Sequence, residues 1–140
     1  MSSSNSNSHT APSKEEENYI TKLRNIGLHP KETPHHTTLP RASILIPIFA
    51  RNNNIPYILL TQRPQTLSSH PGDVCFPGGR QDPMDNQNDI TTALRETLEE
   101  VGIQPQHLTP LCRLATIESK NGLCVTPIVA LVTPSRQAEP

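Results

Sequence analysis

The chain has 140 residues with 12 basic and 13 acidic side chains, a formal net charge of −1, and this length allows at most one domain of ordinary size. A nearly neutral chain lacks the basic surface that a nucleic-acid-binding protein normally carries, so we expect no nucleic-acid partner. No apolar run approaches the about 20 residues of a membrane-spanning helix, and we expect no membrane partner.

The first 40 residues read as a tail, a helix and a connector. Residues 1–14 are a Ser/Asn-rich tract that cannot bury enough surface to offset chain entropy, so this tail is predicted to be disordered. Residues 15–40 follow as a short helix and a Pro-rich connector. Three glutamates favour the helix N-terminus, Tyr19, Leu23 and Ile26 share one side, and Gly27 ends the helix.

Residues 41–140 alternate strands with one strong helix. The predicted strands are Ser43–Phe49, broken by Pro47, then Tyr57–Thr61, Val74–Phe76, Leu111–Ile117 and Leu123–Val132, with turn material at Pro105–Pro110. The first two should form a hairpin, and Asn121-Gly122 is a hairpin signal for the last two. Strands on both sides of a helix imply a mixed sheet covered by helices, of the α/β class. The cysteines, Cys75, Cys112 and Cys124, lack paired spacing and are predicted to be reduced.

Two loops in this part are candidates for ligand binding. The polar stretch Gln62–Asp73 is long for a compact domain, and such loops are more often functional than not. Within it Arg63 and His70 could contact phosphate, since a guanidinium pairs bidentately with phosphate oxygens; they could equally only fix the loop. Gly78-Gly79 is predicted to turn a strand into a loop, because paired glycines permit close approach of a ligand to the backbone.

The helix from residue 90 to 101 has an acidic face. At 3.6 residues per turn, Glu96, Glu99 and Glu100 share one side. Asp89 is a plausible N-cap, and Gly102 is a natural residue to end the helix. An apolar stripe is predicted on the opposite side, consisting of Ile90, Leu94, Leu98 and Val101.

This acidic face is unfavourable for the helix itself. Like charges three or four residues apart cost about 0.2–0.5 kcal/mol each, and anions in the last turn cost about 0.3–1 kcal/mol against the macrodipole. A bound divalent cation would reverse the sign of this penalty, roughly 1–2 kcal/mol in total. The alternative is a solvated acidic face without function.

Six residues of this part of the chain resemble the Nudix box, whose pattern is Gly-x5-Glu-x7-Arg-Glu-apolar-x-Glu-Glu-x-Gly-apolar. They are Gly79, Arg95, Glu96, Glu99, Glu100 and Gly102. Counted back from Arg95, however, the first Glu of the box falls on Gln87 and its Gly on Gln81, and Thr97 stands in an apolar slot. One Nudix subgroup has a longer loop here. The run from Leu59 to Gly79, continuing through Asp82–Asp85 and Thr92–Glu96, resembles the coenzyme A diphosphatases of the superfamily.

The resemblance implies a Nudix α/β/α sandwich and metal-dependent cleavage of coenzyme A or acyl-CoA to 3′,5′-ADP and (acyl-)4′-phosphopantetheine. It implies Mg²⁺ or Mn²⁺, hard cations that suit carboxylate oxygens, and Arg95 as a residue that orients a carboxylate. Glu96 could instead act as the general base. The implied metal ligands are Glu96, Glu99 and Glu100, and the implied substrate-binding residues are Arg63, His70, Gly78, Gly79 and Arg80.

Nudix domains usually continue for several dozen residues beyond the point that corresponds to Pro140, so the domain at 41–140 looks C-terminally truncated, with one sheet face left uncovered. Two alternatives to coenzyme A hydrolysis follow: an inactive Nudix-fold binding module, or a hydrolase of other nucleoside diphosphate derivatives such as ADP-ribose. The resemblance suggests a peroxisomal or mitochondrial protein. A cytoplasmic location is expected if there is no targeting signal, and neither a transit-peptide pattern nor a C-terminal Ser-Lys-Leu is present.

Overall fold

The computed structural model describes residues 14–29, 38–50, 56–66 and 71–133, so residues 1–13 of the predicted disordered tail and most of the Pro-rich connector lie outside the described residues, whereas Lys14 begins the first helix. Its helices are α1 (Lys14–Ile26) and α2 (Asp89–Val101), with short 3-10 turns η1 (Pro83–Asp85) and η2 (Pro105–His107). Its strands are β1 (Arg41–Phe49), β2 (Tyr57–Ile58), β3 (Thr61–Gln62), β4 (Val74–Cys75), β5 (Gly78–Arg80), β6 (Leu108–Arg113), β7 (Ile117–Glu118) and β8 (Cys124–Val132).

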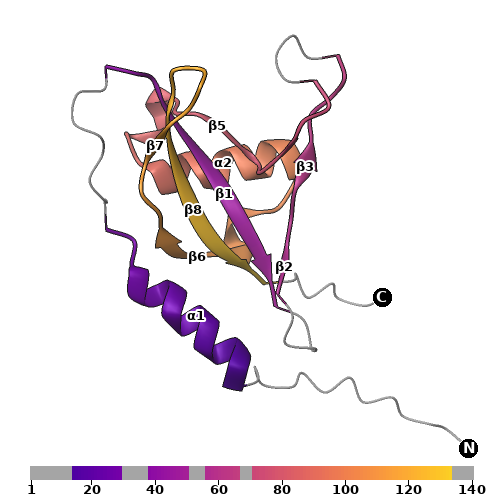
Figure 1. The fold of residues 1–140 in the computed structure, drawn as a ribbon, viewed down its shortest axis with the longest axis vertical. Helices are drawn as coiled ribbons and strands as arrows, with labels where there is room; N and C mark the ends of the chain where they lie inside the picture. Colours follow the sequence, from indigo (N-terminus) through magenta and orange to yellow (C-terminus); the bar gives the residue numbers. More distant parts are fainter. Residues whose placement is uncertain (1–13, 30–37, 51–55, 67–70, 134–140) are drawn as a thin grey trace, which may run out of the picture.

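The main sheet is mixed, as predicted. Its two long strands, β1 and β8, run parallel from Arg41 opposite Cys124 to Phe49 opposite Val132. The other neighbours are antiparallel: β2 and β5 pair with β1, and β6 and β7 pair with β8. Both predicted hairpins are present, since β2 pairs antiparallel with β1 and β8 with β7, but the predicted strand Tyr57–Thr61 is divided and Thr61 belongs to β3. A separate two-stranded ribbon of β3 and β4 stands beside the sheet (Figure 1).

The predicted break at Pro47 is wrong, because β1 continues through it. The carbonyl of Pro47 accepts a hydrogen bond from the Leu59 N–H at 3.2 Å, so the polar groups of Pro47 face β2 and not β8. The missing proline N–H therefore falls on the side where the neighbouring strand is only two residues long. The parallel ladder to β8 loses no donor there.

Strand β6 begins at Leu108, three residues earlier than predicted. Thr109 and Pro110 pair with β8 although prolines rarely enter sheets. This position is tolerated because β6 is an edge strand of the sheet, with a register shift just after Pro110. The predicted Leu111–Ile117 strand is divided, since the chain leaves the ladder after Arg113 and returns as β7.

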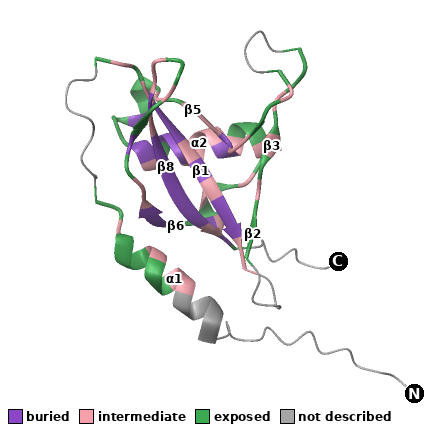
Figure 2. Ribbon diagram, in the orientation of Figure 1, coloured by how far each residue is buried: buried purple, intermediate pink, exposed green. Residues whose placement is uncertain are grey.

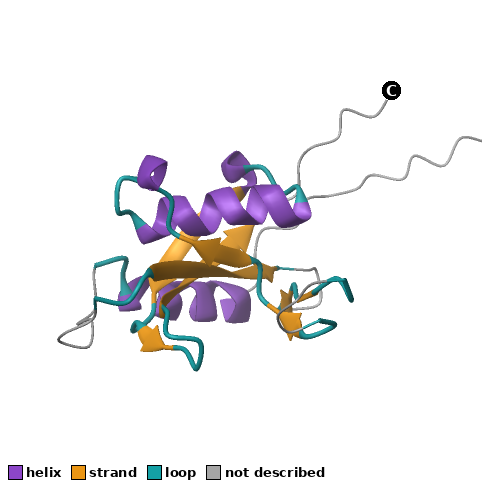
Figure 3. Cartoon of the chain, turned by 90° about the horizontal axis from the view of Figure 1, so that it is seen from above, coloured by secondary structure: helices purple, strands orange, loops and turns teal. Residues whose placement is uncertain are grey.

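Helices lie on both faces of the sheet, which confirms the sandwich (Figure 3). On the α2 side the core is formed by Leu45, Ala93 and Ile128, none of which is exposed. On the other side Tyr19 and Leu23 of α1 pack against a cluster of Ile48, Cys112 and Val129. The expectation of an uncovered sheet face is thus wrong around β6, where α1 covers it.

Burial follows this arrangement. The long strands β1 and β8 are the most buried elements, whereas the β3–β4 ribbon has no buried residue (Figure 2). Cys112 and Cys124 are buried and Cys75 is half-buried, and all are free thiols as predicted. Among the described residues, no helix is long and apolar enough to cross a membrane.

Candidate active site

Gly78 and Gly79 form strand β5, which corrects the prediction of a loop. Gly78 pairs with Ile44 and Gly79 with Ser43. A Cβ on Gly78 would lie 2.4 Å from the backbone oxygen of Ser43, so only glycine fits against β1. A Cβ on Gly79 would lie 2.4 Å from Cδ of Glu96, so the missing side chain at this position is replaced by a carboxylate from α2.

Helix α2 begins one residue earlier than the sequence suggested. Its N-cap is Asn88, whose side-chain oxygen accepts from the Ile90 N–H at 2.9 Å and the Thr91 N–H at 3.3 Å. Asp89, the predicted cap, is instead buried, with 2 % of its surface exposed. It forms an ion pair with Arg113 of β6 and lies 3.5 Å from the Ser43 hydroxyl. Gly102, with φ 72°, ends the helix as predicted.

The face of α2 that contacts the sheet is smaller and more polar than the predicted apolar stripe. Its buried residues are Asp89, Thr92, Ala93 and Thr97, whereas Ile90 and Leu94 pack at the margin of the core. Small side chains here allow α2 to approach β1 and β5 closely. The hydroxyls of Thr92 and Thr97 are satisfied by Asp85 and by the Ala93 carbonyl, so burying them leaves no unpaired donor.

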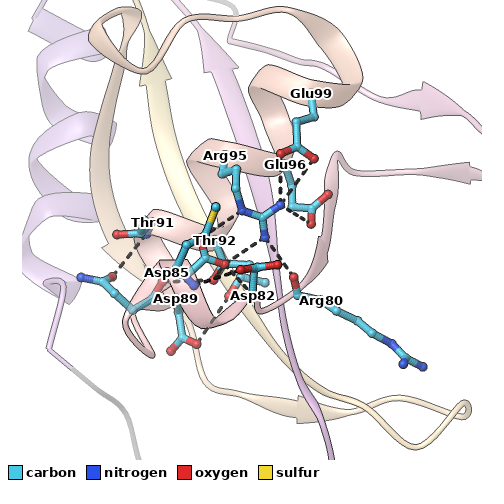
Figure 4. A network of polar contacts seen from close by, with 12 residues as sticks. Arg80, Asp82, Asp85, Asp89, Thr91, Thr92, Arg95, Glu96 and Glu99 are labelled. Atoms are coloured by element: carbon cyan, nitrogen blue, oxygen red, sulfur yellow. Dashed lines mark hydrogen bonds and ion pairs between the residues drawn. The ribbon is translucent and has the colours of Figure 1, made fainter.

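Arg95 is at the centre of the polar network in Figure 4. Its Nε and Nη2 each donate to one oxygen of Asp85 at 2.9 Å, and Nη2 also donates to the carbonyl of Arg80. Its Nη1 donates to Glu96 at 2.9 Å and to Glu99 at 3.3 Å. These carboxylates raise the pKa of the guanidinium above its ordinary value, with Asp85 contributing most.

Asp85 is the functional-site residue that the sequence pattern missed. Its side chain is only 1 % exposed, and it accepts from the Asp82 N–H and the Thr92 hydroxyl as well as from Arg95. The hydrogen bonds from Arg95 hold the pKa of this carboxyl well below its usual range, against the opposing effect of burial. A signal was available, because the spacing of the box, five residues between its Gly and its first acid, leads from Gly79 to Asp85 instead of Gln87.

The three glutamates of the acidic face lie on α2 as predicted, and each already has a partner. Glu96, with a 16 % exposed side chain, and Glu99, with 56 %, both contact Arg95. Glu100 accepts from the Gly78 N–H at 3.0 Å. Burial raises the pKa of Glu96, and the charges of Glu99 and Glu100 add to this while Arg95 opposes it.

In this arrangement the described residues contain no group of three His, Cys, Asp or Glu side chains positioned to hold a metal ion. The donor set nevertheless fits a hard divalent cation. Glu96, Glu99 and Glu100 provide carboxylate oxygens only, from adjacent turns on one side of a single helix, and hard cations prefer such ligands. Divalent binding would require the three carboxylate groups to come closer together than they do in this arrangement.

A cavity of about 660 Å³ lies on the other side of β5. Its floor includes Ile44 and Val125 of the central strands, and the backbone of Gly78 and Gly79 forms part of its wall. Two of the predicted substrate-binding side chains, Arg63 and Arg80, line it. His70, the third, lies outside the described residues. The structure thus brings Arg63, Arg80 and both glycines to one cavity, and Arg63 also lines a smaller neighbouring cavity together with Glu100 of the acidic face.

Comparison with known proteins gives concordant results. A family model described as NUDIX domain matches residues 39–128. The peroxisomal coenzyme A diphosphatase NUDT7 of Mus musculus is 39 % identical over 105 residues, covering 75 % of this chain and 44 % of the mouse protein. The uncharacterized Nudix hydrolase NudL of Yersinia pestis is 50 % identical over 92 residues, covering 66 % of this chain and 45 % of that protein.

Among solved structures, the Ap4A hydrolase of C. elegans superposes with a TM-score of 0.57 at 23 % identity, covering 73 % of this chain and 74 % of that one. At this identity the likeness concerns the fold. The chain spans less than half the length of the two curated relatives.

Proposed function

The chain belongs to the Nudix family, and from this premise we propose that it hydrolyses the diphosphate bond of coenzyme A or an acyl-CoA to 3′,5′-ADP and (acyl-)4′-phosphopantetheine. The choice of substrate is supported by the similarity to the mouse coenzyme A diphosphatase. The reaction type rests on one observation above all: Glu96, Glu99 and Glu100 project from one side of α2, where Glu100 contacts Gly78 and Glu96 lies against Gly79.

Each residue of the site has a proposed task. Nudix hydrolases generally use divalent metal ions, and Glu96, Glu99 and Glu100 would hold Mg²⁺ or Mn²⁺. When bound, the cation would neutralise charge on the diphosphate and lower the pKa of a water. Arg95 would orient the carboxylates of Glu96 and Glu99, since its contacts to both are already made.

The substrate side of the site follows from the cavity. The backbone of Gly78 and Gly79 would lie against the diphosphate, because no side chain stands between this backbone and the cavity. Arg63, Arg80 and His70 would contact substrate phosphates. We also propose a peroxisomal location, by similarity to the mouse relative, which colocalisation of a tagged chain with a peroxisomal marker would test.

A second candidate function is a ligand-binding module that does not hydrolyse. One observation favours it: in the described residues the three glutamates are occupied by Arg95 and Gly78 and form no cluster able to hold a metal ion. Such a module would bind coenzyme A without turnover.

The test is an assay of the purified chain with coenzyme A, with and without Mg²⁺ or Mn²⁺, in which release of 3′,5′-ADP is followed by chromatography. We expect release only with a divalent cation, and a loss of at least about 100-fold in the Glu99→Gln/Glu100→Gln double variant, as for removal of a main electrostatic contribution. Glu118→Gln, on the exposed strand β7, is the matched control and should behave as wild type.

Three results would count against the proposal. Turnover retained in the double variant would exclude the metal assignment. Calorimetric binding of coenzyme A without turnover would support the binding module. If the chain hydrolysed ADP-ribose in preference to coenzyme A in a competition assay, the substrate would be assigned to other nucleoside diphosphate derivatives.

A further inference from the structure

The cavity behind β5 has an asymmetric distribution of charge and apolar surface. Ile44, Val125 and Leu123 provide an apolar floor, while Arg63 and Arg80 bring two positive charges and Asp73 one negative charge to its lining. Its volume of about 660 Å³ is within the range of small-molecule sites. An apolar floor with a net positive rim suits a flat, uncharged ring that carries phosphate, and it suits a neutral polyamide chain less well.

The arginines of this region differ in what they are free to do. Arg95 has its guanidinium occupied by Asp85, Glu96 and Glu99. Arg113 is paired with Asp89 beneath the other end of α2. Within the part of the chain that the structure describes, no hydrogen bond or ion pair is made by the Arg80 side chain, which is exposed. Arg80 can therefore pair with a ligand without breaking a contact that the described residues make.

The direction of Arg80 separates it from the acidic face. Its carbonyl oxygen points toward Arg95, whereas its side chain extends away from Glu96 and Glu99 (Figure 4). A phosphate held by this guanidinium would thus be a different one from the diphosphate beside the glutamates. The wall between them is thin, because Glu96 occupies the place of the absent Gly79 side chain and the cavity contacts the backbone of the same residue.

We propose that this cavity holds the nucleotide half of the substrate, and that Arg80 binds the phosphate on the nucleoside ribose that distinguishes coenzyme A from dephospho-coenzyme A. The inference rests on the proposed function for the identity of the substrate. The pantetheine half then lies outside the cavity, and Arg80 determines specificity without contacting the reacting atoms.

Binding of substrate fragments tests this without requiring turnover or metal. The probes are 3′,5′-ADP, 5′-AMP and 4′-phosphopantetheine, titrated into the full chain by calorimetry in the presence of a chelator. We expect 3′,5′-ADP to bind about 10- to 100-fold more tightly than 5′-AMP, the usual range for a charge-assisted contact to phosphate. In Arg80→Gln the affinities for 3′,5′-ADP and 5′-AMP should become equal, with the affinity for 5′-AMP the same as in wild type. Arg24→Gln, on the exposed side of α1, is the matched control and should retain the difference.

Hydrolysis gives an independent check. The ratio of kcat/KM for coenzyme A to that for dephospho-coenzyme A should fall by about 10- to 100-fold in Arg80→Gln and should be retained in Arg24→Gln.

The cavity assignment is overturned if 4′-phosphopantetheine is the fragment whose affinity depends on Arg80, if 3′,5′-ADP and 5′-AMP bind wild type equally, or if no fragment binds. Fragment binding with the expected Arg80 dependence, in a chain that does not hydrolyse coenzyme A, would overturn the proposed function and leave this assignment supported.

Discussion

The two ends of α2 place acidic residues in opposite circumstances. At the N-terminus the negative charge of Asp89 is favourable to the helix dipole, buried, and paired with Arg113. At the C-terminus Glu99 and Glu100 are exposed, crowd Glu96, and oppose the dipole, with no basic residue of α2 in its last turn. One helix thus carries buried charge that stabilises the fold at its N-terminus and exposed charge that opposes the helix dipole at its C-terminus.

The largest expected effect comes from breaking the N-terminal end. Asp89→Ala leaves Arg113 buried without its partner, and loss of one member of a buried ion pair costs about 3–5 kcal/mol of the free energy of unfolding. Urea denaturation would measure it. The double variant Asp89→Leu/Arg113→Met should recover most of the loss, since apolar pairs replace buried ion pairs well. A single-variant loss below about 1 kcal/mol would show that the pair does not anchor α2.

The adjacent glycines of β5 should respond to alanine in different ways. Gly78→Ala forces a methyl group against the backbone of Ser43 and Ile44, and overpacking of this kind costs about 1–3 kcal/mol of stability. Gly79→Ala meets only the flexible Glu96 carboxylate, so we expect less than about 1 kcal/mol of destabilisation together with loss of coenzyme A hydrolysis. Thermal unfolding and activity measured on both variants check this, and equal stability losses would contradict the assigned contacts.

Acidification should distinguish Asp85 from Glu96. The pKa of Asp85 in the folded protein is below its ordinary 3.8, so its stabilisation is complete above that pH and is lost as the pH falls below it. Asp85→Asn should cost about 1.5–3 kcal/mol at pH 7, by weakening hydrogen bonds to a charged group, and should flatten the loss of stability below about pH 4. The pKa of Glu96 is raised, so its contribution to stability increases as the pH falls. If Asp85→Asn lost stability more steeply than wild type below about pH 4, the acid dependence would have to come from another group.

The smallest effect is a gain. Glu100→Gln keeps an oxygen for the Gly78 N–H but removes an anion from the last helical turn, so the chain should be stabilised by about 0.3–1 kcal/mol in metal-free buffer at low salt. The gain should shrink as salt screens the charge. Adding Mn²⁺ should make wild type more stable than Glu100→Gln, because the ion stabilises by mass action only the chain that binds it. Urea denaturation under both conditions measures this reversal.

Much of α2 could be predicted from the sequence because its determinants are local. Helical periodicity put Glu96, Glu99 and Glu100 on one face, and Gly102 marked the end. Asp89 was misassigned as a cap because aspartate and asparagine are equally good N-caps, and only the position of Arg113, far along the chain, decides between Asn88 and Asp89. The parallel pairing of β1 with β8 is likewise a long-range contact that no local pattern specifies.

Two extra residues between Asp85 and Arg95 explain why the motif spacing did not predict that these two side chains pair. Counted from Arg95, the expected acid of the motif falls on Gln87, two residues too late. The structure accommodates the two extra residues at Asn86 and Gln87, both in the left-handed region with φ of 51° and 58°. This tight turn leaves Asp85 close enough to Arg95 for the guanidinium to donate to both carboxylate oxygens.

The pairing of Arg95 with Glu96 and Glu99 has a practical consequence. Carboxylates held together only by a metal ion would repel one another when the ion is removed. Here the Arg95 guanidinium, which is fixed by Asp85, provides positive charge to Glu96 and Glu99 without a metal ion. Purification in EDTA should therefore yield an intact fold, so that a divalent cation can be supplied or withheld as an experimental variable.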